Sequence, residues 1–404
     1  MNVVSHPTTS GISSKLFRRF APTSTLPPTI RQLLLQQHIS KQPTRVQVKE
    51  WVESIRKRRG KFECLGECDP DMSAMLRSKL TMLQEYPVQK QDISVKYLRD
   101  HCHLRARTPR LASMLRLRDQ TQRTLHGHFK RNFTYVYTPV LTANDCEGAG
   151  EVFRVQSSNH PTPSENRKES FDRAAYLTVS SQLHLEALST SLSRVYTLSP
   201  CFCAERSQTG RHLSEFWMLE AEWAFTQSVS EVCRVVEDSV ESALQQRSED
   251  LALLRQSFLE GADNSQKPWG MVPYGDVVKA LEKYQAATRK FYYEPSWGEP
   301  LHSEHGRLLS EHLVEGPVFM TDYACSLKPF YMRINDDDRT VASFDLLVPY
   351  LGELVGGSLR EEWHNVLWGN LGAHNLDPED FSWYLDFRKD GGAPHEGCDL
   401  DSTD

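Results

Sequence analysis

The sequence lacks several features that would assign it to a specialised class of protein. None of its 404 residues belong to an apolar run approaching the ~18 residues of a membrane-spanning helix, so we expect no membrane association. The formal net charge of -6 gives no overall attraction to nucleic acid, and a phosphate-bearing partner would need a local basic patch. Of the nine cysteines, Cys64 and Cys68 lie close together, but no second pair of cysteines or histidines completes a zinc site. Reduced thiols in an intracellular compartment are the simplest interpretation.

Acidic residues are missing from the first 49 positions, where the first to appear is Glu50. The same segment is rich in Ser and Thr and carries seven basic residues, which are Lys15, Arg18, Arg19, Arg31, Lys41, Arg45 and Lys49. A basic, acid-free start without a long apolar segment is typical of a mitochondrial transit peptide. We therefore predict that residues 1–45 direct the protein to the mitochondrial matrix, with a plain disordered tail as the alternative.

Apolar periodicity along the rest of the chain indicates strands gathered around long helices. Helices are expected over residues 113–132, 229–258 and 274–284, and a strand, a helix and a strand over 175–202. Further strands are expected over 45–62 (one or two, with a basic tip), 133–141, 317–323, 328–335 and 341–349. This pattern predicts an α+β fold with a mostly antiparallel sheet.

One short stretch, "FCAERSQTGRHLSEFWMLEAE" from Phe202 to Glu222, combines acids, bases and aromatics in the span of a hairpin. Arginines and a histidine can pair with phosphate oxygens, a carboxylate can accept from an exocyclic amine, and Phe216 offers a flat face to a purine. The composition suits a nucleoside triphosphate. An ordinary surface hairpin of mixed charge is the alternative.

Several motifs in a consistent order resemble those of the class II aminoacyl-tRNA synthetases, and closely those of the asparaginyl-tRNA synthetases, from about Tyr86 to Gly397. "YPVQKQDISVKYLRDHCHLRART" resembles the hinge between tRNA-binding and catalytic domains, and "VYTPVLTANDCEGAGEVFRV" resembles motif 1 with the loop that follows it. "FCAERSQTGRHLSEFWMLEAE" is similar to motif 2, and "FDLLVPYLGELVGGSLREE" with "WYLDFRKDGGAPH" to the approach to motif 3. "VSSQLHLEAL" is typical of the asparagine branch. The resemblance implies a class II catalytic domain that activates asparagine with ATP and transfers it to tRNA(Asn).

The resemblance also implies which residues hold the amino acid. Glu147 and Gln182 match the positions that bind the substrate ammonium, for which a carboxylate and an amide oxygen are natural partners. Arg388 matches the arginine that orients the substrate side chain.

Four residues of motif 2 match nucleotide-binding positions. Arg211 and His212 correspond to residues that meet the outer phosphates of ATP, Glu205 to the carboxylate of the motif, and Phe216 to the ring that stacks on adenine. Of these, Glu205, Arg211 and His212 are the implied catalytic residues, and they would act by positioning and charge stabilisation.

The resemblance further implies Mg²⁺ on the phosphates. Asp345 and Glu353 match its carboxylate ligands, and Ser358 lies beside them on the ATP side. A homodimer is implied as well, formed through a helix and strand that correspond to residues 113–139.

Three departures from the family pattern stand out. Motif 2 should begin Phe-Arg-x-Glu, and here Cys203 replaces the arginine that grips the α-phosphate. After "GGAPHEG" the sequence reads "CDLDSTD", with Asp399 and Asp401 in place of two glycines, and the arginine and helix of motif 3 are expected to be absent. Roughly 40 residues separate Arg45 from Tyr86, less than a closed five-stranded anticodon-binding barrel requires.

The predicted organisation is a targeting segment over residues 1–45, a remnant of an OB-type anticodon-binding segment over 46–85, and a catalytic domain over 86–404. The predicted function is asparagine–tRNA ligation in mitochondrial translation with impaired activity. The alternatives are an inactive synthetase-like protein that binds tRNA or a synthetase chain, and a ligase repurposed to another acceptor.

Overall fold

The computed structural model describes seven stretches of the chain, which are residues 55–58, 61–64, 93–143, 152–156, 174–204, 213–245 and 269–401. The chain divides into two compact units, residues 1–92 and 93–404. The predicted domain boundaries remain a prediction.

In the first unit the described residues form a hairpin. Strand β1 (Ile55–Arg58) pairs antiparallel with β2 (Lys61–Cys64), and Ile55 faces Cys64 in the register. Two strands with basic residues near their turn agree with the sequence pattern. Residues 45–54, where the pattern begins, lie outside the described residues.

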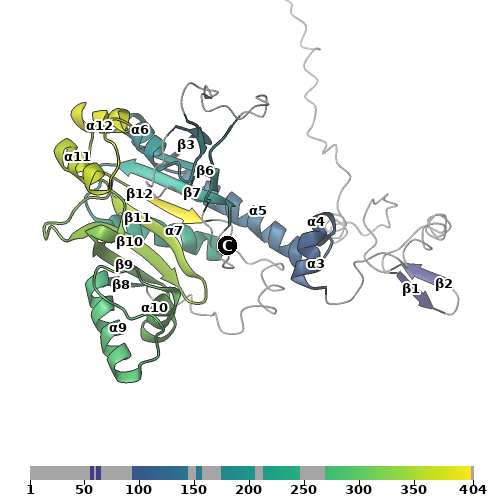
Figure 1. The fold of residues 1–404 in the computed structure, drawn as a ribbon. Coiled ribbons are helices and arrows are strands. Elements are labelled where there is room, and N and C mark those ends of the chain that lie inside the picture. The colour runs from purple at the N-terminus through teal and green to yellow at the C-terminus, as the bar shows by residue number, and fades with distance from the viewer. Residues whose placement is uncertain are drawn as a thin grey trace, which may run out of the picture. The chain divides into compact units, whose positions relative to one another are not determined.

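The second unit is built on an eight-stranded sheet (Figure 1). In spatial order its strands are β3 (Thr134–Tyr135), β6 (Arg194–Phe202), β7 (Glu215–Ala224), β12 (His395–Asp401), β11 (Gly352–Leu359), β10 (Thr340–Val348), β9 (Val318–Ala324) and β8 (Gly270–Pro273). The strands from β6 to β9 are antiparallel to their neighbours, and the outermost pairs, β3 with β6 and β8 with β9, are parallel. A separate two-stranded ribbon joins β4 (Leu141–Thr142) to β5 (Tyr176–Leu177). The predicted α+β class with a mostly antiparallel sheet is confirmed.

Helices cover both faces of this sheet. One face packs against α5 (Pro109–Phe129) and α7 (Val229–Leu244), with Leu125 and Val236 buried against Phe344 of β10. The other face packs against α6 (Gln182–Leu192), α9 (Tyr274–Thr288), α11 (His364–Ala373) and α12 (Ser382–Lys389). Here Leu183 and Tyr384 lie in one apolar cluster with Met320 of β9.

Shorter helical segments complete the unit. They are α3 (Val95–Asp100), α4 (Cys102–Arg105), α10 (Ser303–Arg307), a π-helical turn (Leu308–Leu313) and a 3₁₀ turn (Cys325–Leu327). Among the described helices, none is both long enough and apolar enough to cross a membrane.

Two expected strands differ from the structure. The strand expected over residues 133–141 is broken, because the chain leaves the sheet after Val136, whose N–H still reaches the Tyr196 carbonyl at 3.0 Å. Pro139, which has no N–H to donate, follows three residues later. The strand expected over 328–335 is wrong as well, since this segment makes only single bridges, Met332 to Arg360 and Ile334 to Val341.

The last strand, β12, lies in the middle of the sheet between β7 and β11 (Figure 1). Its first residue, His395, is the last residue of "WYLDFRKDGGAPH", the stretch that resembles the approach to motif 3. A side chain at Gly397 would overlap the Glu222 carboxylate and the Arg360 guanidinium, and one at Gly357 of β11 would meet the Phe344 ring. Backbone without side chains is therefore required at both positions, because charged and aromatic groups fill the space above them.

Candidate functional site

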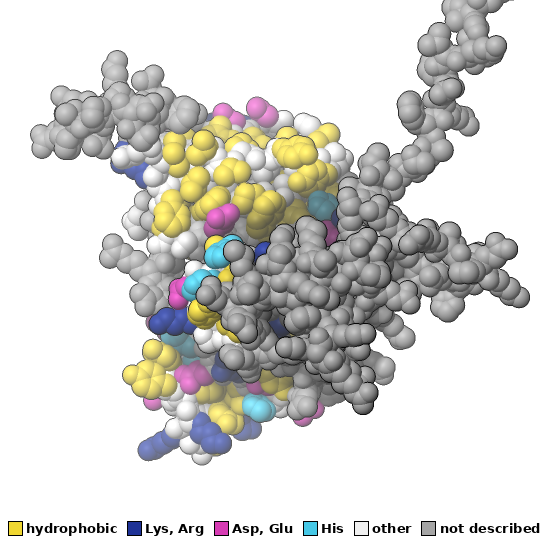
Figure 2. Space-filling model, turned by 90° about the vertical axis from the view of Figure 1, so that its right-hand side faces the viewer, with side chains coloured by type: hydrophobic (Ala, Val, Ile, Leu, Met, Phe, Trp, Pro, Cys, Tyr) yellow, Lys and Arg dark blue, Asp and Glu magenta, His cyan; other side chains and the backbone are white. Residues whose placement is uncertain are grey.

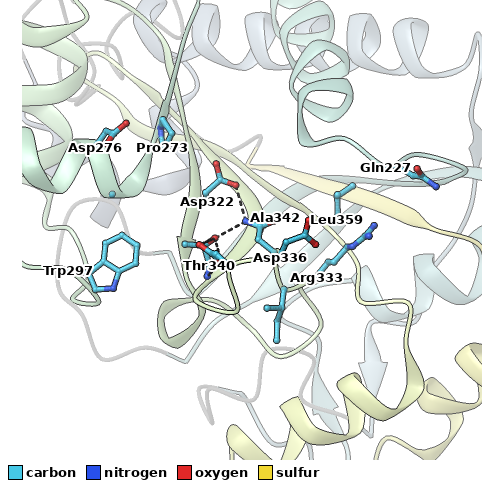
Figure 3. A pocket seen from close by; sticks show the side chains of 14 residues that line it. Gln227, Pro273, Asp276, Trp297, Asp322, Arg333, Asp336, Thr340, Ala342 and Leu359 are labelled. Carbon is cyan, nitrogen blue, oxygen red and sulfur yellow. Dashed lines mark hydrogen bonds between the residues drawn. The ribbon is translucent and has the colours of Figure 1, made fainter.

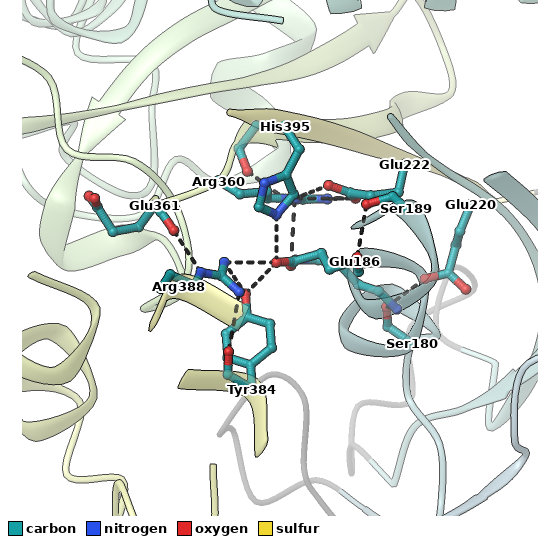
Figure 4. Close-up of polar contacts among 12 residues, drawn as sticks. Ser180, Glu186, Ser189, Glu220, Glu222, Arg360, Glu361, Tyr384, Arg388 and His395 are labelled. Atoms are coloured by element: carbon teal, nitrogen blue, oxygen red, sulfur yellow. Dashed lines mark hydrogen bonds and ion pairs between the residues drawn. The ribbon is translucent and has the colours of Figure 1, made fainter. Parts of the chain in front are cut away.

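Five ionisable side chains meet on the sheet face that α6 and α12 cover (Figure 4). They are Glu186 of α6, Glu222 of β7, Arg360 directly after β11, Arg388 of α12 and His395 of β12, and we call them the buried ion-pair cluster. Each side chain is less than a tenth exposed. Five segments of the chain, from α6 to β12, are thus joined at one point.

Glu186 is at the centre of the cluster. One carboxylate oxygen, Oε2, accepts hydrogen bonds from Tyr384 Oη at 2.7 Å, Arg388 Nη2 at 2.9 Å and His395 Nε2 at 3.0 Å. Burial by itself would raise the pKa of Glu186, but the charges of Arg388 and Arg360 and the bond from His395 lower it well below the ordinary value. Glu186 is therefore a carboxylate at neutral pH.

Arg360 joins the cluster to the strands. Its guanidinium donates to Glu222 through Nη2 at 2.9 Å and to Ser358 Oγ through Nη1 at 2.7 Å, and its Nε lies 3.8 Å from Glu186 Oε1. Burial tends to lower the pKa of Arg360, but Glu222 and Glu186 more than offset this and raise it. Ser358, predicted on the ATP side, thus has its hydroxyl oxygen bonded within the cluster.

A second buried carboxylate, Glu220, holds the start of α6. It accepts from Ser180 Oγ at 2.5 Å and from the Ser181 N–H at 2.9 Å. Burial raises the pKa of Glu220, while these bonds oppose the rise. The helix start carries Gln182, so Glu220 helps to fix the position of a predicted substrate-binding residue.

The predicted magnesium carboxylates lie further along the same sheet face. Both oxygens of Asp345 lie 2.7 Å from Lys328 Nζ, which in turn lies 4.1 Å from the centre of the Tyr323 ring. Burial works against the charge on Lys328, but Asp345, then Glu353 and Asp399, raise its pKa. The structure therefore adds to the predicted pair a third carboxylate and an internal cation.

Asp399 reaches this region from β12. A side chain built at Gly356 would lie 3.4 Å from Asp399 Oδ1 and 3.6 Å from Glu353 Oε1, so the two carboxylates flank the same glycine. The sequence comparison with the family placed a glycine at position 399. The structure places the Asp399 carboxylate beside Glu353, and a charge near the nucleotide remains a prediction.

The stretch that resembles motif 2 belongs to a hairpin, but the first strand of that hairpin, β6, ends at its first residue, Phe202, and the stretch itself supplies the connection and most of β7. Cys201 faces Phe216 across the two strands, and the N–H of Cys203 reaches the Ser214 carbonyl at 3.3 Å just beyond β6. Phe216 is half-buried. Glu147, Glu205, Arg211 and His212 lie outside the described residues.

The structure also contains a cavity of about 610 Å³ away from these residues (Figure 3). Its lining includes Asp276 and Trp297 near α9, Asp322 of β9, and Arg333. None of the residues predicted for the site lines it. The described residues predicted for the site therefore lie outside this cavity.

Comparison with known proteins identifies the family. The family described as tRNA synthetases class II (D, K and N) matches residues 94–401. The chain belongs to the class II aminoacyl-tRNA synthetases. The motifs singled out in the sequence had indicated this family, and the match now spans nearly the whole second unit.

Individual synthetases of the asparagine branch are similar to the chain over most of its length. The mitochondrial asparagine–tRNA ligase of Saccharomyces cerevisiae is 40% identical over 343 residues, covering 78% of this chain and 69% of the relative. The asparagine–tRNA ligase of Microcystis aeruginosa is 38% identical, covering 86% of this chain and 75% of the relative. The structure of asparaginyl-tRNA synthetase from Pyrococcus horikoshii complexed with asparaginyl-adenylate has a TM-score of 0.69 and 28% identity, covering 85% of this chain and 72% of that chain.

Sequence reasoning predicted Gln182, Arg388, Asp345 and Glu353 as site residues, which remains a prediction, but it named none of the partners that the structure gives them. Glu186 and Arg360 stand inside the quoted motifs, yet neither was assigned a role. The sequence of β7 contains a pattern that could have predicted these partners. Glu220 and Glu222 lie two residues apart and therefore on the same face of a strand whose neighbouring residues are apolar. Buried carboxylates require cations or donors nearby, so such a strand predicts basic partners on neighbouring elements.

Proposed function

We propose that the chain is the asparagine–tRNA ligase of mitochondrial translation, acting with reduced activity. By homology its activity is asparagine–tRNA ligation, which consumes ATP. The observation that supports the assignment of substrate roles is that Gln182 and Arg388, two residues implied to hold asparagine, both hydrogen-bond to Glu186.

In the first step the asparagine carboxylate attacks the α-phosphate of ATP, and pyrophosphate leaves. Glu147 and Gln182 bind the substrate ammonium, while Arg388 orients the side chain. The protein forms no covalent bond to the substrates in this step. The rate therefore depends on how well it aligns the asparagine carboxylate with the α-phosphate and on how well its side chains compensate the phosphate charge.

The nucleotide is held by motif 2 and by the carboxylates of β10 and β11. Phe216 stacks on adenine, Arg211 and His212 meet the outer phosphates, and Glu205 is the carboxylate of the motif. Oxygen ligands of this kind suit Mg²⁺, which would neutralise phosphate charge when bound between Asp345 and Glu353, with Ser358 nearby. Lys328 shares Asp345 with that position and contributes a fixed positive charge.

In the second step the terminal adenosine of tRNA(Asn) attacks the adenylate carbonyl, and AMP leaves. The described hairpin β1–β2 and the basic residues around it belong to the segment that we propose as a remnant of the anticodon-binding domain. Its basic composition supports contacts with tRNA phosphates.

Reduced activity is proposed because of Cys203. A neutral thiol at this position cannot compensate the negative charge that develops on the α-phosphate, which an arginine would do. The same observation favours the second candidate, a synthetase-like protein without catalysis that binds tRNA or a synthetase chain.

A homodimer is the proposed assembly. Hydrophobic side chains crowd part of the face seen in Figure 2. On α5 and the segment after β3, the exposed apolar residues include Met114, Leu115 and Tyr137, the last with 88% of its surface exposed. Light scattering at micromolar concentration tests the proposal, which a strict monomer would contradict.

Localisation to the mitochondrial matrix is supported by the acid-free basic start and by the mitochondrial relatives of two yeasts. Fusing residues 1–49 to a fluorescent reporter tests it, and a diffuse cytosolic signal would contradict it.

The activity itself is tested by ATP–pyrophosphate exchange with asparagine. Exchange that depends on asparagine, and not on aspartate, supports the ligase. Asparagine and ATP binding without exchange would instead favour the non-catalytic candidate.

A further inference from the structure

The cavity shown in Figure 3 is rich in carboxylates and lies apart from the described residues that are predicted for the ligase site. Its volume of about 610 Å³ falls within the roughly 300–1,000 Å³ that is usual for small-molecule sites. Its lining includes the four aspartates Asp276, Asp322, Asp336 and Asp337 and one basic residue, Arg333. Because carboxylates predominate, a ligand that fills this cavity is expected to carry positive charge and to donate hydrogen bonds.

Asp322 of β9 is the carboxylate that the protein itself uses least fully. Its Oδ1 accepts from Asn335 Nδ2 at 3.1 Å, and its Oδ2 accepts from Thr321 Oγ1 at 2.8 Å. An ionised carboxylate offers about four acceptor positions, so each oxygen retains one for a ligand. Both present partners are neutral, and the negative charge of Asp322 is therefore available to a cation in the cavity.

The other charged groups of the lining have partners of their own. Asp337 accepts from the N–H groups of Arg339 and Thr340, and these hydrogen bonds lower the pKa of its carboxyl group. Asp276 pairs with Lys279 at 3.0 Å in an exposed ion pair. The positive charge of Arg333 is offset in part by Glu362, whose Oε1 lies 3.8 Å from Arg333 Nη2. The cavity therefore keeps an excess of negative charge.

Trp297 gives the cavity an aromatic wall that is held firmly in place. The Tyr274 hydroxyl donates to the Glu299 carbonyl at 2.9 Å and accepts from the Gly298 N–H at 3.1 Å, which fixes the segment that carries Trp297. A side chain at Gly275 would lie 2.9 Å from Trp297 Cζ3, so the ring packs directly on the backbone at the start of α9. With 39% of its surface exposed, the ring is fixed and still accessible to a ligand.

The Trp297 ring already has a cation beside it. The guanidinium carbon of Arg339 lies 5.2 Å from the ring centre, within the ~6 Å of a cation–π contact. Arg339 is exposed and follows residues 336–338, which are all aspartates. This contact shows that the ring can receive a planar guanidinium, a group that also pairs well with carboxylates through its fork of N–H donors.

Apolar side chains complete the lining, and they are Pro273, Ile334, Ala342 and Leu359. They offer no hydrogen bonds, so they suit an aliphatic chain and not a ligand that is polar along its whole length. The lining thus combines separate carboxylates, one aromatic ring and apolar surface.

We propose that this cavity is a binding site for a small organic dication, which has a guanidinium group and an ammonium group joined by an aliphatic chain. Trp297 receives the guanidinium, Asp322 provides a carboxylate for the charge, and the apolar side chains contact the aliphatic part. The inference goes beyond asparagine–tRNA ligation and does not rest on it, because no described residue predicted for that activity lines the cavity.

The probe is agmatine, in which a guanidinium and an ammonium group are joined by four methylene groups. Calorimetric titration of the full chain at about 0.15 M salt, where diffuse attraction between charges is largely screened beyond ~8 Å, should show one agmatine bound per chain. The neutral analogue 1,4-butanediol, which has the same aliphatic chain, should not bind.

Asp322→Asn removes the charge and keeps the local contacts. The φ angle of Asp322 is +56°, which asparagine tolerates as well as aspartate does, and the new amide can accept from Asn335 and donate to the Thr321 hydroxyl. Agmatine affinity should fall ~10–100-fold, the scale of a hydrogen bond to a charged group. The matched control is Asp119→Asn, which removes an exposed carboxylate paired with Arg123 on α5 and should leave agmatine affinity unchanged.

Two substitutions of Trp297 test the aromatic wall. Trp297→Leu keeps an apolar side chain but removes the aromatic face, and agmatine affinity should fall ~2–30-fold, the scale of a cation–π contact. Trp297→Phe keeps an aromatic face and should lose less. Thermal unfolding shows whether each variant is folded, and the difference between two folded variants at the same position reports the aromatic face and not general damage.

A second ligand separates a free dication from an arginine side chain of another protein. N-acetyl-arginine methylamide presents the same guanidinium on a peptide backbone and has no second cationic end. Weaker binding than agmatine supports the small dication. Equal or tighter binding would overturn that assignment in favour of an arginine side chain.

Three further results would overturn the site itself. The first is no binding of agmatine by the unmodified chain. The second is binding that stays unchanged in both Asp322→Asn and Trp297→Leu, and the third is a loss in Asp119→Asn as large as that in Asp322→Asn, because the attraction would then be diffuse. Each result is read from binding alone, so failure of this proposal is distinguishable from failure of the proposed ligase activity.

Discussion

Two groups of buried charges lie on one sheet face, at the proposed amino-acid end around Glu186 and at the proposed nucleotide end around Asp345, and they are neutralised differently. Around Glu186, two arginines, a histidine and a tyrosine share two carboxylates, and the pairs run between α6, β7, β11, β12 and α12. Around Asp345, one lysine serves three carboxylates that come from neighbouring strands. In the first arrangement each carboxylate is bonded to an arginine, whereas in the second three carboxylates all act on the one ammonium of Lys328 and raise its pKa.

Under the proposed function, the first group would serve amino-acid recognition, because a cluster with many mutual partners restricts side-chain motion. The second group would serve the nucleotide, because carboxylate oxygens suit a divalent ion that arrives with the phosphates. The predictions below test each side, beginning with the largest expected effect.

Removing the cation at the centre of the amino-acid end should have the greatest effect on stability. Arg360→Met leaves Glu222 and Glu186 buried without their shared partner, and breaking a buried pair in this way costs about 3–5 kcal/mol. Chemical denaturation measures the change in the free energy of unfolding. Arg123→Met is the matched control, because its pair with Asp119 is exposed on α5 and should contribute about 0–0.5 kcal/mol. Equal effects of the two variants would contradict the view that burial makes this pair important.

At the nucleotide end, the largest effect should be on rate. If Cys203 limits compensation at the α-phosphate, Cys203→Arg should raise asparagine-dependent exchange by up to about 10²–10³-fold, the scale of one preorganised donor. Cys203→Ser, which is neutral and of similar size, should leave the rate near that of the unmodified chain. High exchange in the unmodified chain, unaltered by either substitution, would show that Cys203 is not limiting.

Replacing Lys328 tests whether its charge competes with a metal ion at Asp345. Lys328→Met removes two charge-assisted hydrogen bonds that Asp345 accepts and should destabilise the fold by about 1.5–3 kcal/mol. Because Asp345 then loses its paired ammonium, the variant should require less Mg²⁺ for half-maximal exchange. A magnesium requirement that rises instead would mean that Lys328 supports the bound phosphates and does not compete with the ion.

Glu396 is a buried carboxylate that has no cation bonded to it among the described residues, unlike Glu186 and Asp345. Glu396 of β12 is buried on the α7 side, and among the described residues neither oxygen has a hydrogen-bond partner, although Thr226 and Trp223 lie nearby. Burial raises the pKa of Glu396 to about 8, and Glu231 contributes in the same direction.

The folded state therefore holds a proton on Glu396 between the unfolded pKa of 4.5 and about 8, while the unfolded state has released it. Stability should fall as the pH rises through this window, by at most about 1.4 kcal/mol per pH unit. Glu396→Gln removes the titration, so the variant should become progressively more stable than the unmodified chain from pH 5 to pH 8. Denaturation curves with the same pH dependence for both chains would contradict a proton on Glu396.

Sequence reasoning predicted local structure well where the pattern was long and regular. The helix expected over residues 113–132 appears as α5, and the hairpin expected from motif 2 appears as β6 and β7. Sequence reasoning failed at residues 328–335, where a strand was expected. Aromatic and β-branched composition favours a strand, but it cannot show that this segment forms only isolated bridges with its neighbours and no continuous ladder.

For the site, the sequence supplied residue types and their resemblance to a family, but not the partners. Gln182 and Arg388 were identified through motifs that lie about 200 residues apart in the sequence. That one carboxylate, Glu186, holds both became visible only in the fold, because α6 and α12 pack on the same sheet face.

The sequence by itself determined the α+β class, the synthetase family, the order of the motifs and the replacement of the motif 2 arginine by Cys203. These follow from local patterns of residue type along the chain. Only the tertiary structure decided that β12 lies in the centre of the sheet, that Lys328 pairs with Asp345, and that Glu186 joins Gln182 to Arg388. Each of these depends on contacts between segments that are distant in the sequence. At the two charged contacts a buried charge needs a partner, and only the fold shows which side chain supplies it.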